Sequence, residues 1–374
     1  MTELLIVGAG PFGLAMAAWA EHHDLAYRII GVPMEFWRRH MPRGMLLRSG
    51  IDWHLDPIGE ATIERFLAER GSRPEEVEPL GLDLYLDYVE WFRRRKGIEV
   101  EDRRLHRLDA GFRARMTDGS TIEAHRVLLA LGFRHFQHEP EAIKQIVPED
   151  RREHTCDRVD LDALAGKRCL IVGGRQSAFE WAALLLEAGA RSVDLVYRHD
   201  TPTFAPSDWS FVDELIVRTL REPLWYRRLE EEERRRLDHR FWAEGRSKLE
   251  PWLAERVAAA RLWPRTRIVA CDEDLHVRLD NGRRLAVDHV VLATGYRVDL
   301  HRVPFLRRGD LLSRIELDAG SPVLDTRMQT SLPGLHVTSL PAARTFGPFF
   351  GFTVAACASA RLVGSAFGVP PEPA

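Results

Sequence analysis

Residues 4–13 read LLIVGAGPFG, a short apolar run that ends in a glycine-rich turn. A helix-like apolar stretch, LAMAAWA, follows directly, and a second apolar run, YRIIGV, begins at Tyr27. A strand, a GxGxxG turn, a helix and a second strand in this order predict a βαβ unit. In such a unit Gly8 permits the tight turn, Gly10 lets the backbone approach a pyrophosphate, and Gly13 lets the helix pack closely on the strand. The stretch therefore predicts a dinucleotide-binding domain.

The same pattern occurs a second time in the chain. Residues 169–173 read CLIVG, the counterpart of LLIVG, and an apolar helix-like stretch and a second strand follow them. Each copy also closes on a similar stretch, DGSTIEAHRVLLALGF at 118–133 and NGRRLAVDHVVLATGY at 281–296. The opening glycines are 165 residues apart and the closing glycines 163, so the whole unit is repeated. The repeat predicts an α/β protein with two Rossmann-like dinucleotide-binding domains.

The positions of the two copies predict that the second domain is inserted in the first. We expect the first domain to comprise residues 1–160 and 297–374, and the second domain residues 161–296. Residues 59–96 and about 208–262 lie between the repeated elements and are rich in helix formers, so we predict that both are helical insertions.

Composition excludes several other classes of protein. The 374 residues are 45% hydrophobic and 29% charged, which is typical of a soluble globular protein. The net charge of −3 gives no reason to expect a nucleic-acid partner, and no apolar run reaches the roughly 18 residues of a membrane span. Cys156, Cys169, Cys271 and Cys357 form no CxxC pair, which argues against a disulfide scaffold, a zinc site and a redox dithiol. A reducing cytoplasm is the expected setting.

Glu35 is the acidic residue nearest the end of the second strand of the first copy, where an acid that binds ribose is expected. Its alternative role is that of an acid in the first turn of a helix. In the second copy the phosphate loop reads GGRQSA at 173–178, and the following strand ends at Arg198 rather than at an acid. An arginine there favours the 2′-phosphate of NADPH over the free ribose of NADH. The alternative is that Arg198 is a solvated surface residue.

The segment MPRGMLLRS at residues 41–49 has two interpretations. It is either a loop with a short buried strand, or a set of apolar side chains beside a flat ring with Arg48 near the reacting end. The sequence leaves both open.

Four motifs carry a resemblance to a known family: GAGPFG at 8–13, GGRQSAFE at 173–180, ATGY at 293–296 and LPGLHVTSLPAARTFGPFFGF at 332–352. Together they resemble the flavoproteins with two dinucleotide-binding domains. Among these the chain looks most like the class B flavin monooxygenases, which include flavin-containing, Baeyer–Villiger and N-hydroxylating enzymes.

The resemblance implies two cofactors, FAD and NADPH, and their contacts. For FAD the implied residues are Gly8, Gly10, Pro11, Phe12, Gly13, Glu35, Trp37, Met45, Leu46, Leu47, Thr338 and Pro341. For NADPH they are Gly173, Gly174, Arg175, Gln176, Ser177 and Arg198, with Ala293, Thr294, Gly295 and Tyr296 as the turn between the domains. Ser207 and Asp208 become candidate substrate contacts, and Arg48 and Asp56 candidate catalytic groups. No metal is implied.

The implied activity is that of a monooxygenase. NADPH would reduce FAD, and the reduced flavin would react with O₂ to give a C4a-(hydro)peroxide that oxygenates a small molecule at nitrogen, sulfur or a carbonyl. The alternatives are an NAD(P)H-dependent flavin reductase with a small-molecule or protein acceptor, and a non-catalytic flavin-binding sensor. The partners expected are a small-molecule substrate and O₂, and a homodimer is compatible with the resemblance.

Overall fold

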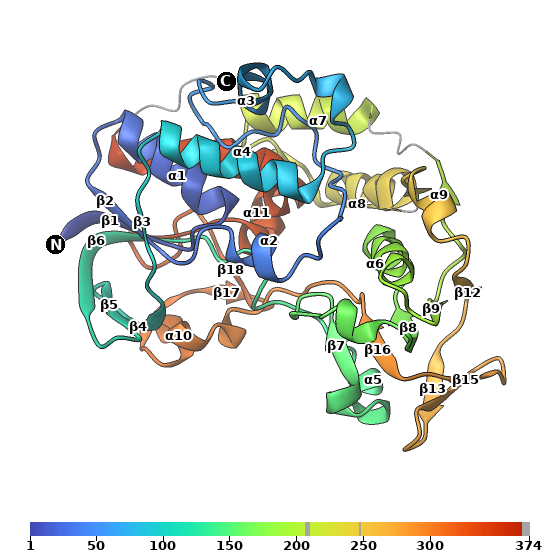
Figure 1. Cartoon of the computed structure of the whole chain (residues 1–374). Helices are drawn as coiled ribbons and strands as arrows, with labels where there is room; N and C mark the ends of the chain where they lie inside the picture. Colours follow the sequence, from blue (N-terminus) through green and yellow to red (C-terminus); the bar gives the residue numbers. More distant parts are fainter. Residues whose placement is uncertain (206–209, 247, 369–374) are drawn as a thin grey trace.

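The computed structural model of the chain describes residues 1–205, 210–246 and 248–368, and these form two α/β units that face each other (Figure 1). The chain passes from the first unit to the second and back again. The predicted α/β fold with one unit inserted in the other is therefore confirmed. No helix in the described part of the chain is long and apolar enough to cross a membrane.

The first unit is built on a seven-stranded sheet in the order β3-β2-β1-β6-β5-β4, with β19 also paired to β6. The strands are β1 (Thr2–Val7), β2 (Tyr27–Ile30), β3 (Val100–Glu101), β4 (Leu105–Asp109), β5 (Arg113–Met116), β6 (Thr121–Leu129) and β19 (Leu335–Val337). The pairs β2–β3, β1–β2, β1–β6 and β6–β19 are parallel, whereas β4, β5 and β6 form an antiparallel meander. The last strand comes from the far end of the chain, so the sheet is complete only when both ends are present.

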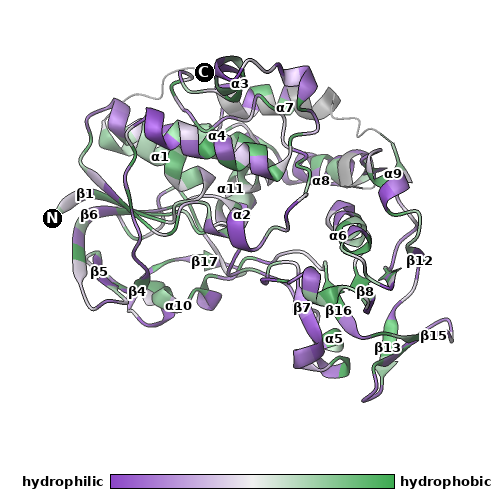
Figure 2. Cartoon of the chain, viewed as in Figure 1, coloured by the Kyte–Doolittle hydropathy of each residue, from purple (hydrophilic) through white to green (hydrophobic). Residues whose placement is uncertain are grey.

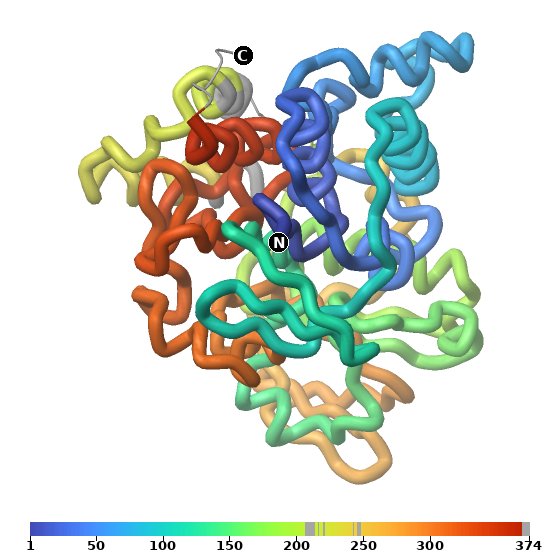
Figure 3. Tube along the Cα trace, turned by 90° about the vertical axis from the view of Figure 1, so that its left-hand side faces the viewer, coloured from blue at the N-terminus to red at the C-terminus, as the bar shows by residue number. Residues whose placement is uncertain are grey.

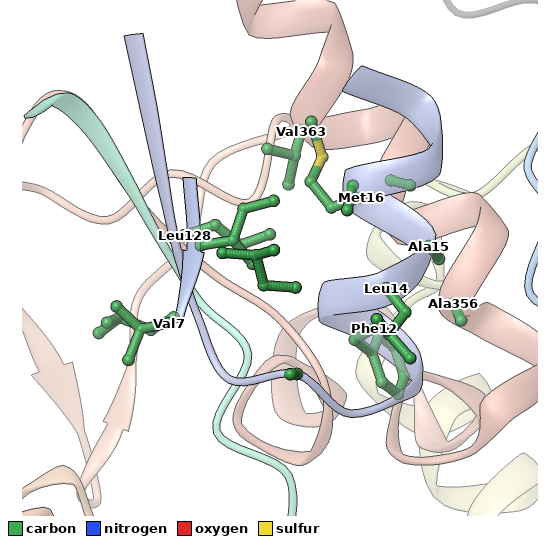
Figure 4. Packing of buried hydrophobic residues seen from close by; sticks show 14 of the residues in the cluster. Val7, Phe12, Leu14, Ala15, Met16, Leu128, Ala356 and Val363 are labelled. Carbon is green, nitrogen blue, oxygen red and sulfur yellow. The ribbon is translucent and has the colours of Figure 1, made fainter. Parts of the chain in front are cut away.

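Helices from the two ends of the chain cover one face of this sheet. The helices of the first unit are α1 (Pro11–His22), α2 (Glu35–Arg39), α3 (Ile63–Glu69), α4 (Leu82–Arg95), α10 (Pro304–Arg307), α11 (Ala343–Phe346) and α12 (Ala356–Gly364). Leu14 and Met16 of α1 lie in one core with Val363 of α12 (Figure 4). Gly364 is in close contact with the ring of Trp19, so a larger residue would overlap it. Figure 3 shows the resulting neighbourhood of the N-terminal (blue) and C-terminal (red) segments.

The predicted helical insertion at 59–96 is confirmed as α3 and α4. Helix α4 carries hydrophobic residues on one side and hydrophilic residues on the other (Figure 2), and its buried side includes Tyr85, Tyr88 and Phe92. The Tyr88 hydroxyl donates to the carbonyl oxygen of Ala61 at 3.0 Å and accepts from the amide of Leu55 at 2.9 Å. The insertion is therefore attached to the loop that follows α2.

The second unit has a five-stranded, fully parallel sheet in the order β12-β9-β8-β16-β7. Its strands are β7 (Arg152–His154), β8 (Arg168–Val172), β9 (Ser192–Val196), β12 (Arg261–Trp263) and β16 (His289–Leu292). Its helices are α5 (Glu141–Ile146), α6 (Gln176–Glu187) and α9 (Leu253–Arg256). An antiparallel sheet of β13 (Ile268–Cys271), β14 (His276–Leu279) and β15 (Arg284–Ala286) stands at its end, and β10 (Thr203–Phe204) pairs with β11 (Lys248–Leu249). The remaining pair, β17 (Leu317–Asp318) and β18 (Ser321–Pro322), lies in the segment that returns to the first unit.

The predicted boundary at residue 160 is wrong. Strand β7 pairs with β16 of the second unit, and Ile143 of α5 packs in the core of that unit. The chain crosses between the units earlier, where His138 N–H donates to Gly295 O at 2.9 Å and Arg297 N–H donates to Phe136 O at 2.7 Å. A three-residue strand is too short to show a pattern in the sequence, which is why the boundary was misplaced.

The second insertion leaves the second unit and packs on the first. It contains α7 (Ser210–Arg221), α8 (Glu231–Arg240), the short helix η4 (Tyr226–Arg228) between them and the π-helical turn η5 (Phe241–Arg246). Trp225, Tyr226 and Phe241 form one buried cluster with Phe349 and Val354 of the C-terminal segment. The predicted insertion at about 208–262 therefore contains several helices between residues 210 and 246 and the short helix α9 after them, and its last residues belong to β12 of the second sheet.

Candidate functional site

A cavity of about 1940 Å³ lies between the two units. Both glycine-rich loops line it, as do the segment 45–48, the crossing at 293–296 and the aromatic residues of the second insertion. Pockets that hold one small ligand usually measure ~300–1,000 Å³. The cavity therefore has room for more than one ligand.

The first glycine-rich loop has the geometry that the sequence predicts. Gly8 has a φ of +111°, and a side chain there would overlap the carbonyl oxygen of Ala130. A side chain at Gly13 would overlap the carbonyl oxygen of Gly8, so this glycine serves helix packing and does not itself line the cavity. A Cβ at Gly10 would meet no atom within 4 Å. Since the N-cap of α1 has no side-chain cap, its first turn presents backbone N–H groups to this open space, as a phosphate requires.

Glu35 lies at the start of α2 and lines the cavity beside Trp37. Burial raises the pKa of the Glu35 carboxyl, but the hydrogen bond and charge of Arg104, together with the charges of Arg134 and Arg39, outweigh burial, and the net shift is downward. The ion pair with Arg104 measures 2.7 Å. Glu35 is thus an ionised acceptor that faces the cavity and also a first-turn helix acid, so both roles left open by the sequence are compatible with its position. Arg103 and Arg104 line the same end of the cavity, and no sequence signal pointed to them.

The second glycine-rich loop opens on the same cavity. The five predicted residues all line it: Gly173, Gly174, Arg175, Gln176 and Ser177. A side chain at Gly174 would overlap the ring of Tyr197, so this glycine allows loop and strand to pack. Helix α6 begins at Gln176, and its N-cap Arg175 makes no side-chain cap, so N–H groups are again presented to the cavity.

In the side-chain amide of Gln176, the oxygen is hydrogen-bonded and the nitrogen is not. Its Oε1 accepts from the backbone N–H of Glu250 at 3.0 Å. Its Nε2 is buried and has no hydrogen-bond partner among the described residues. A buried donor without a partner is costly unless a ligand or water accepts from it. Gln176 is therefore suited to contact a ligand at this loop.

Arg198 follows β9 and lines the cavity with an exposed side chain. Tyr197, His199 and Arg267 line it at the same place, because the backbone of residues 265–266 is hydrogen-bonded to that of residues 197–199. No ion pair of Arg198 occurs within the described ranges. Arg198 and Arg267 thus form a cationic end that suits a phosphate.

The segment Met45–Arg48 connects the two units. The N–H of Leu46 donates to Oε1 of Glu180 at 3.3 Å, and the Nε of Arg48 donates to Oε1 of Glu250 at 2.8 Å. Burial lowers the pKa of Arg48, and Glu250 acts in the opposite direction. Met45, Leu46, Leu47 and Arg48 all line the cavity. The segment is therefore a loop that lines the cavity, with a single bridge between Leu46 and Gly81 and a buried Leu47, and the flat ring of the second interpretation stays a prediction.

The crossing and the C-terminal segment supply the remaining predicted residues. Ala293, Thr294, Gly295 and Tyr296 line the cavity. Thr338 and Pro341 do not, and the two residues between them, Ser339 and Leu340, do. Ser339 has a φ of +68°, which turns the chain so that this pair faces the cavity while Thr338 and Pro341 face the core.

Asp56 lies outside the cavity, which corrects its assignment as a candidate catalytic group. Its side chain is fully buried and forms a 2.9 Å ion pair with Nζ of Lys96. It also accepts from the amides of Ile58, Glu60 and Ala61. Burial opposes ionisation, yet these partners lower the pKa of Asp56 overall. The carboxylate holds a loop together and has no access to a substrate.

The substrate contacts Ser207 and Asp208 lie outside the described residues. Five aromatic residues line one end of the cavity: Trp53, Tyr226, Phe241, Phe349 and Phe352. We call this end the aromatic chamber. The hydroxyls of Ser49 and Thr353, 3.4 Å apart, lie beside it. The quoted C-terminal stretch contained two of these phenylalanines, but only the fold brings them to the insertion.

No cysteine lines the cavity, and all four are described. Burial raises the pKa of the Cys156 and Cys169 thiols to about 11 and that of Cys357 to about 12. These three thiols are therefore protonated at neutral pH. Over the described ranges, no group of three or more His, Cys, Asp or Glu side chains could hold a metal ion.

Several known proteins are similar to this chain. Over 223 residues it is 33% identical to an FAD-dependent urate hydroxylase of Xanthomonas campestris, a match that covers 54% of this chain and 47% of the relative. Over 221 residues it is 30% identical to a ferredoxin–NADP reductase of Burkholderia vietnamiensis, covering 58% and 55%. The matched stretches thus span about half the length of these relatives.

Structural similarity to known proteins covers more of the chain than these sequence matches do. The ornithine hydroxylase of Pseudomonas aeruginosa superposes with a TM-score of 0.79 over 98% of both chains at 15% identity, which confirms the two-domain flavoprotein fold. Residues 5–224 match the family described as pyridine nucleotide-disulphide oxidoreductase. The matched region contains both glycine-rich loops and more than half of the chain. The chain therefore belongs to the pyridine nucleotide-disulphide oxidoreductase family.

Proposed function

We propose that this protein is an FAD-dependent, NADPH-using monooxygenase that oxygenates a small organic molecule. The overall reaction is substrate plus O₂, NADPH and H⁺ to oxygenated substrate, water and NADP⁺. NADPH supplies two electrons, one oxygen atom enters the substrate, and the other leaves as water.

The observation that carries the proposal is that two phosphate-binding loops and an aromatic chamber open on one cavity without a cysteine in its lining. Two loops imply two dinucleotides, of which one can reduce the other. The missing cysteine removes the dithiol that a disulfide reductase of this family would need. A separate chamber for a third, small ligand fits an oxygenated substrate. The hydroxylase function in the names of two similar proteins supports this direction.

The residues of the first loop fit FAD. The open space above Gly10, the uncapped start of α1 and the ionised Glu35 suit a pyrophosphate and a ribose hydroxyl. From there the cavity extends to the segment 45–48 and to Ser339 and Leu340, where a flat ring would lie. When bound, FAD would accept a hydride from NADPH and pass the electrons to O₂.

The residues of the second loop fit NADPH. The start of α6 would bind the pyrophosphate, and the buried Nε2 of Gln176 would find an acceptor on the nucleotide. Arg198 and Arg267 would hold the 2′-phosphate, which NADH lacks. These two arginines are the basis of the proposed preference for NADPH over NADH.

The segment 45–48 places a positive charge and apolar side chains where the two units meet. Arg48 is 23% exposed and is held by Glu250, so its guanidinium is a positioned cation close to the aromatic chamber. A fixed cation stabilises negative charge that develops on oxygen. Met45, Leu46 and Leu47 are apolar and limit water at the same place. We propose Arg48 as the residue that stabilises charge in the reaction.

Isotope labelling tests the proposal. The FAD-loaded protein is mixed with NADPH and ¹⁸O₂ in the presence of a panel of amines, sulfides and ketones, and products are analysed by mass spectrometry. We expect one ¹⁸O atom in one class of product and consumption of about one NADPH for each product molecule. NADPH oxidation that only yields hydrogen peroxide across the whole panel would contradict the proposal.

A flavin reductase is the second candidate, because the chain also matches a ferredoxin–NADP reductase. This candidate predicts fast NADPH-dependent reduction of ferricyanide or of a ferredoxin, with a rate that is independent of any organic substrate. The monooxygenase predicts slow electron transfer to these acceptors and O₂ consumption that the substrate stimulates. A steady-state assay with both acceptors separates the two.

A further inference from the structure

Four aromatic residues form a continuous chain that leads from the cavity to the surface of the first unit. Trp37 of α2 lines the cavity, and its ring packs on that of Tyr85 with centroids 4.9 Å apart. Along α4, the centroid of Tyr88 lies 5.9 Å from that of Tyr85, and the centroid of Trp91 lies 6.2 Å from that of Tyr88. These separations are typical of aromatic rings in contact. We call these four residues the aromatic chain.

The inner end of the aromatic chain lies beside the segment where the flat ring of FAD is proposed to bind. The N–H of Leu82 donates to Met45 O at 3.0 Å, and the N–H of Leu47 donates to Leu80 O at 2.8 Å. These bonds attach the segment 45–47 to the start of α4, and Tyr85 follows Leu82 by one turn of that helix. Of the four members, Trp37 alone lines the cavity. A ligand in the cavity therefore meets the aromatic chain at Trp37.

The two tyrosines of the aromatic chain have no base to which they can give a proton. Tyr85 and Tyr88 are 1% and 0% exposed. The Tyr85 hydroxyl has no hydrogen-bond partner among the described residues, and the Tyr88 hydroxyl donates to the carbonyl oxygen of Ala61, which is a very weak base. A tyrosine that has lost an electron becomes stable only when its phenolic proton also leaves. An oxidised state can therefore pass through these two rings but does not remain on either of them.

The outer end of the aromatic chain does have a proton acceptor. Trp91 is half-buried, and its Nε1–H donates to Oε2 of Glu69 at 2.9 Å. The Glu69 side chain is 43% exposed, so a proton that it accepts can pass to water. The guanidinium of Arg95 lies 5.2 Å from the centroid of the Trp91 ring and repels a positive charge on it. Transfer of the indole proton to Glu69 removes that charge, so Trp91 is the place where the oxidised state comes to rest.

We propose that the aromatic chain is an electron path through which a reductant in solution supplies single electrons to an oxidant in the cavity. Trp37 loses one electron to this oxidant, and Tyr85, Tyr88 and Trp91 replace the electron in turn. Trp91 gives its indole proton to Glu69 and becomes a neutral radical. A thiol or ascorbate in solution then returns one electron and one proton to Trp91, while Glu69 releases its proton to water. The path protects the cavity lining from one-electron oxidation.

Illumination of the FAD-loaded protein tests the path without turnover, because light-excited FAD is a one-electron oxidant. A pulse of blue light is given under argon in the absence of NADPH, and transient absorption and electron paramagnetic resonance detect the neutral indolyl radical. We expect this radical to outlive the excited flavin and to decay faster when ascorbate is added. Absence of an indolyl radical that outlives the excited flavin would overturn the inference.

Variants of the aromatic chain separate an electron path from a packed core. Tyr85→Phe keeps the ring and loses a hydroxyl that makes no hydrogen bond, so we expect normal FAD absorbance and melting temperature but a radical yield lower by about tenfold or more. Trp91→Phe should remove the long-lived radical. Trp263→Phe is the matched control, since Trp263 is also half-buried and its Nε1–H donates to Asp194 at 2.8 Å in the second unit. An unchanged yield in Tyr85→Phe, or an equal loss in the control, would contradict the inference.

Glu69→Gln tests the proton step by itself. Glutamine keeps an oxygen that accepts the indole hydrogen bond but cannot take up the proton at neutral pH. We expect the indolyl radical of this variant to decay about fivefold faster than that of the parent protein, and an unchanged lifetime would exclude Glu69 as the proton acceptor. The measurements use neither O₂ nor an organic substrate. Their outcome is therefore independent of the ¹⁸O labelling that tests the proposed function.

Discussion

The ion pair between Arg48 and Glu250 makes a quantitative prediction about the junction of the two units. The side chains are 23% and 11% exposed, so both charges have lost most of their water. Removing one partner of a fully buried pair typically costs about 3–5 kcal/mol, whereas an exposed pair contributes about 0–1 kcal/mol. For this partly exposed pair we expect Glu250→Ala to cost about 2–3 kcal/mol. Glu250→Gln keeps a hydrogen-bond acceptor and should cost about 1–2 kcal/mol.

A double-mutant cycle isolates the pair from other effects of each substitution. The cycle combines Glu250→Gln with Arg48→Gln, and urea unfolding of the FAD-loaded protein is followed by tryptophan fluorescence and by flavin release. We expect a coupling energy of about 1–2 kcal/mol between the two sites. The matched control is the exposed pair Arg113–Glu123, with N and O 3.0 Å apart and side chains 67% and 45% exposed. Glu123→Gln should change stability by less than about 1 kcal/mol.

The pair also has a functional readout. Because the Glu250 carboxylate neutralises Arg48 near the proposed position of the flavin ring, its loss should raise the flavin midpoint potential. The same substitution should leave the exposed pair and its hairpin unaffected. A coupling energy no larger than that of the control pair, together with an unchanged potential, would refute the reasoning.

Four further predictions concern single residues. Gly13→Ala should abolish FAD retention after gel filtration, because the new methyl group overlaps a backbone carbonyl at the helix–strand contact; normal FAD content would contradict this role. Arg198→Ala should reduce the preference for NADPH over NADH by about tenfold or more in KM, since a charged hydrogen bond is worth about 1.5–3 kcal/mol, and an unchanged ratio would count against it. Asp56→Asn should destabilise the protein by about 2–4 kcal/mol in urea through loss of the pair with Lys96, yet leave the rate of flavin reduction unchanged; a selective loss of rate would restore its catalytic assignment. The pKa of His135 is lowered to about 4 by burial first and then by two neighbouring arginines, so the stability that this neutral imidazole contributes is complete above about pH 6.5 and is lost as the pH falls through 4. Stability–pH curves of His135→Asn should therefore be flatter between pH 6.5 and 4 than those of the parent protein, and parallel curves would exclude the effect.

The sequence alone was sufficient to predict the roles of residues that lie close together along the chain. Gly8, Gly10 and Gly13 follow one another in a strand, turn and helix, so their spacing already fixes their roles. The roles of Arg104 and Glu250 depend on distant partners, Glu35 and Arg48, that only the fold brings together. No periodicity or motif marks such pairs in a single sequence.

The incorrect assignment of Asp56 and the omission of the aromatic chamber also come from contacts between residues that are distant in the sequence. Asp56 follows the cavity-lining segment by only a few residues, yet it lies outside the cavity. Its true partner is Lys96, forty residues later, on the far side of the helical insertion. The aromatic chamber was missed for the opposite reason, because Tyr226 and Phe349 lie far apart in the sequence and next to each other in space.

The pairing of β19 with β6 and of α12 with α1 has a consequence for biosynthesis. Leu335 lies opposite Val127 in the sheet, and Gly364 contacts Trp19, so the first unit lacks a strand and a covering helix until the end of the chain has been made. The inserted unit, in contrast, contains all five strands of its parallel sheet between residues 152 and 292. On a ribosome, the parallel sheet of the inserted unit can therefore form while the unit that begins the chain still lacks β19 and α12. The helical insertion at 210–246 finds its partners Phe349 and Val354 only afterwards. A ribosome-bound chain halted near residue 335 exposes β16 but not β19, because the last residues made remain inside the exit tunnel. It should protect the parallel sheet of the inserted unit from protease and leave α1 open to cleavage, so that the unit encoded second completes its sheet first.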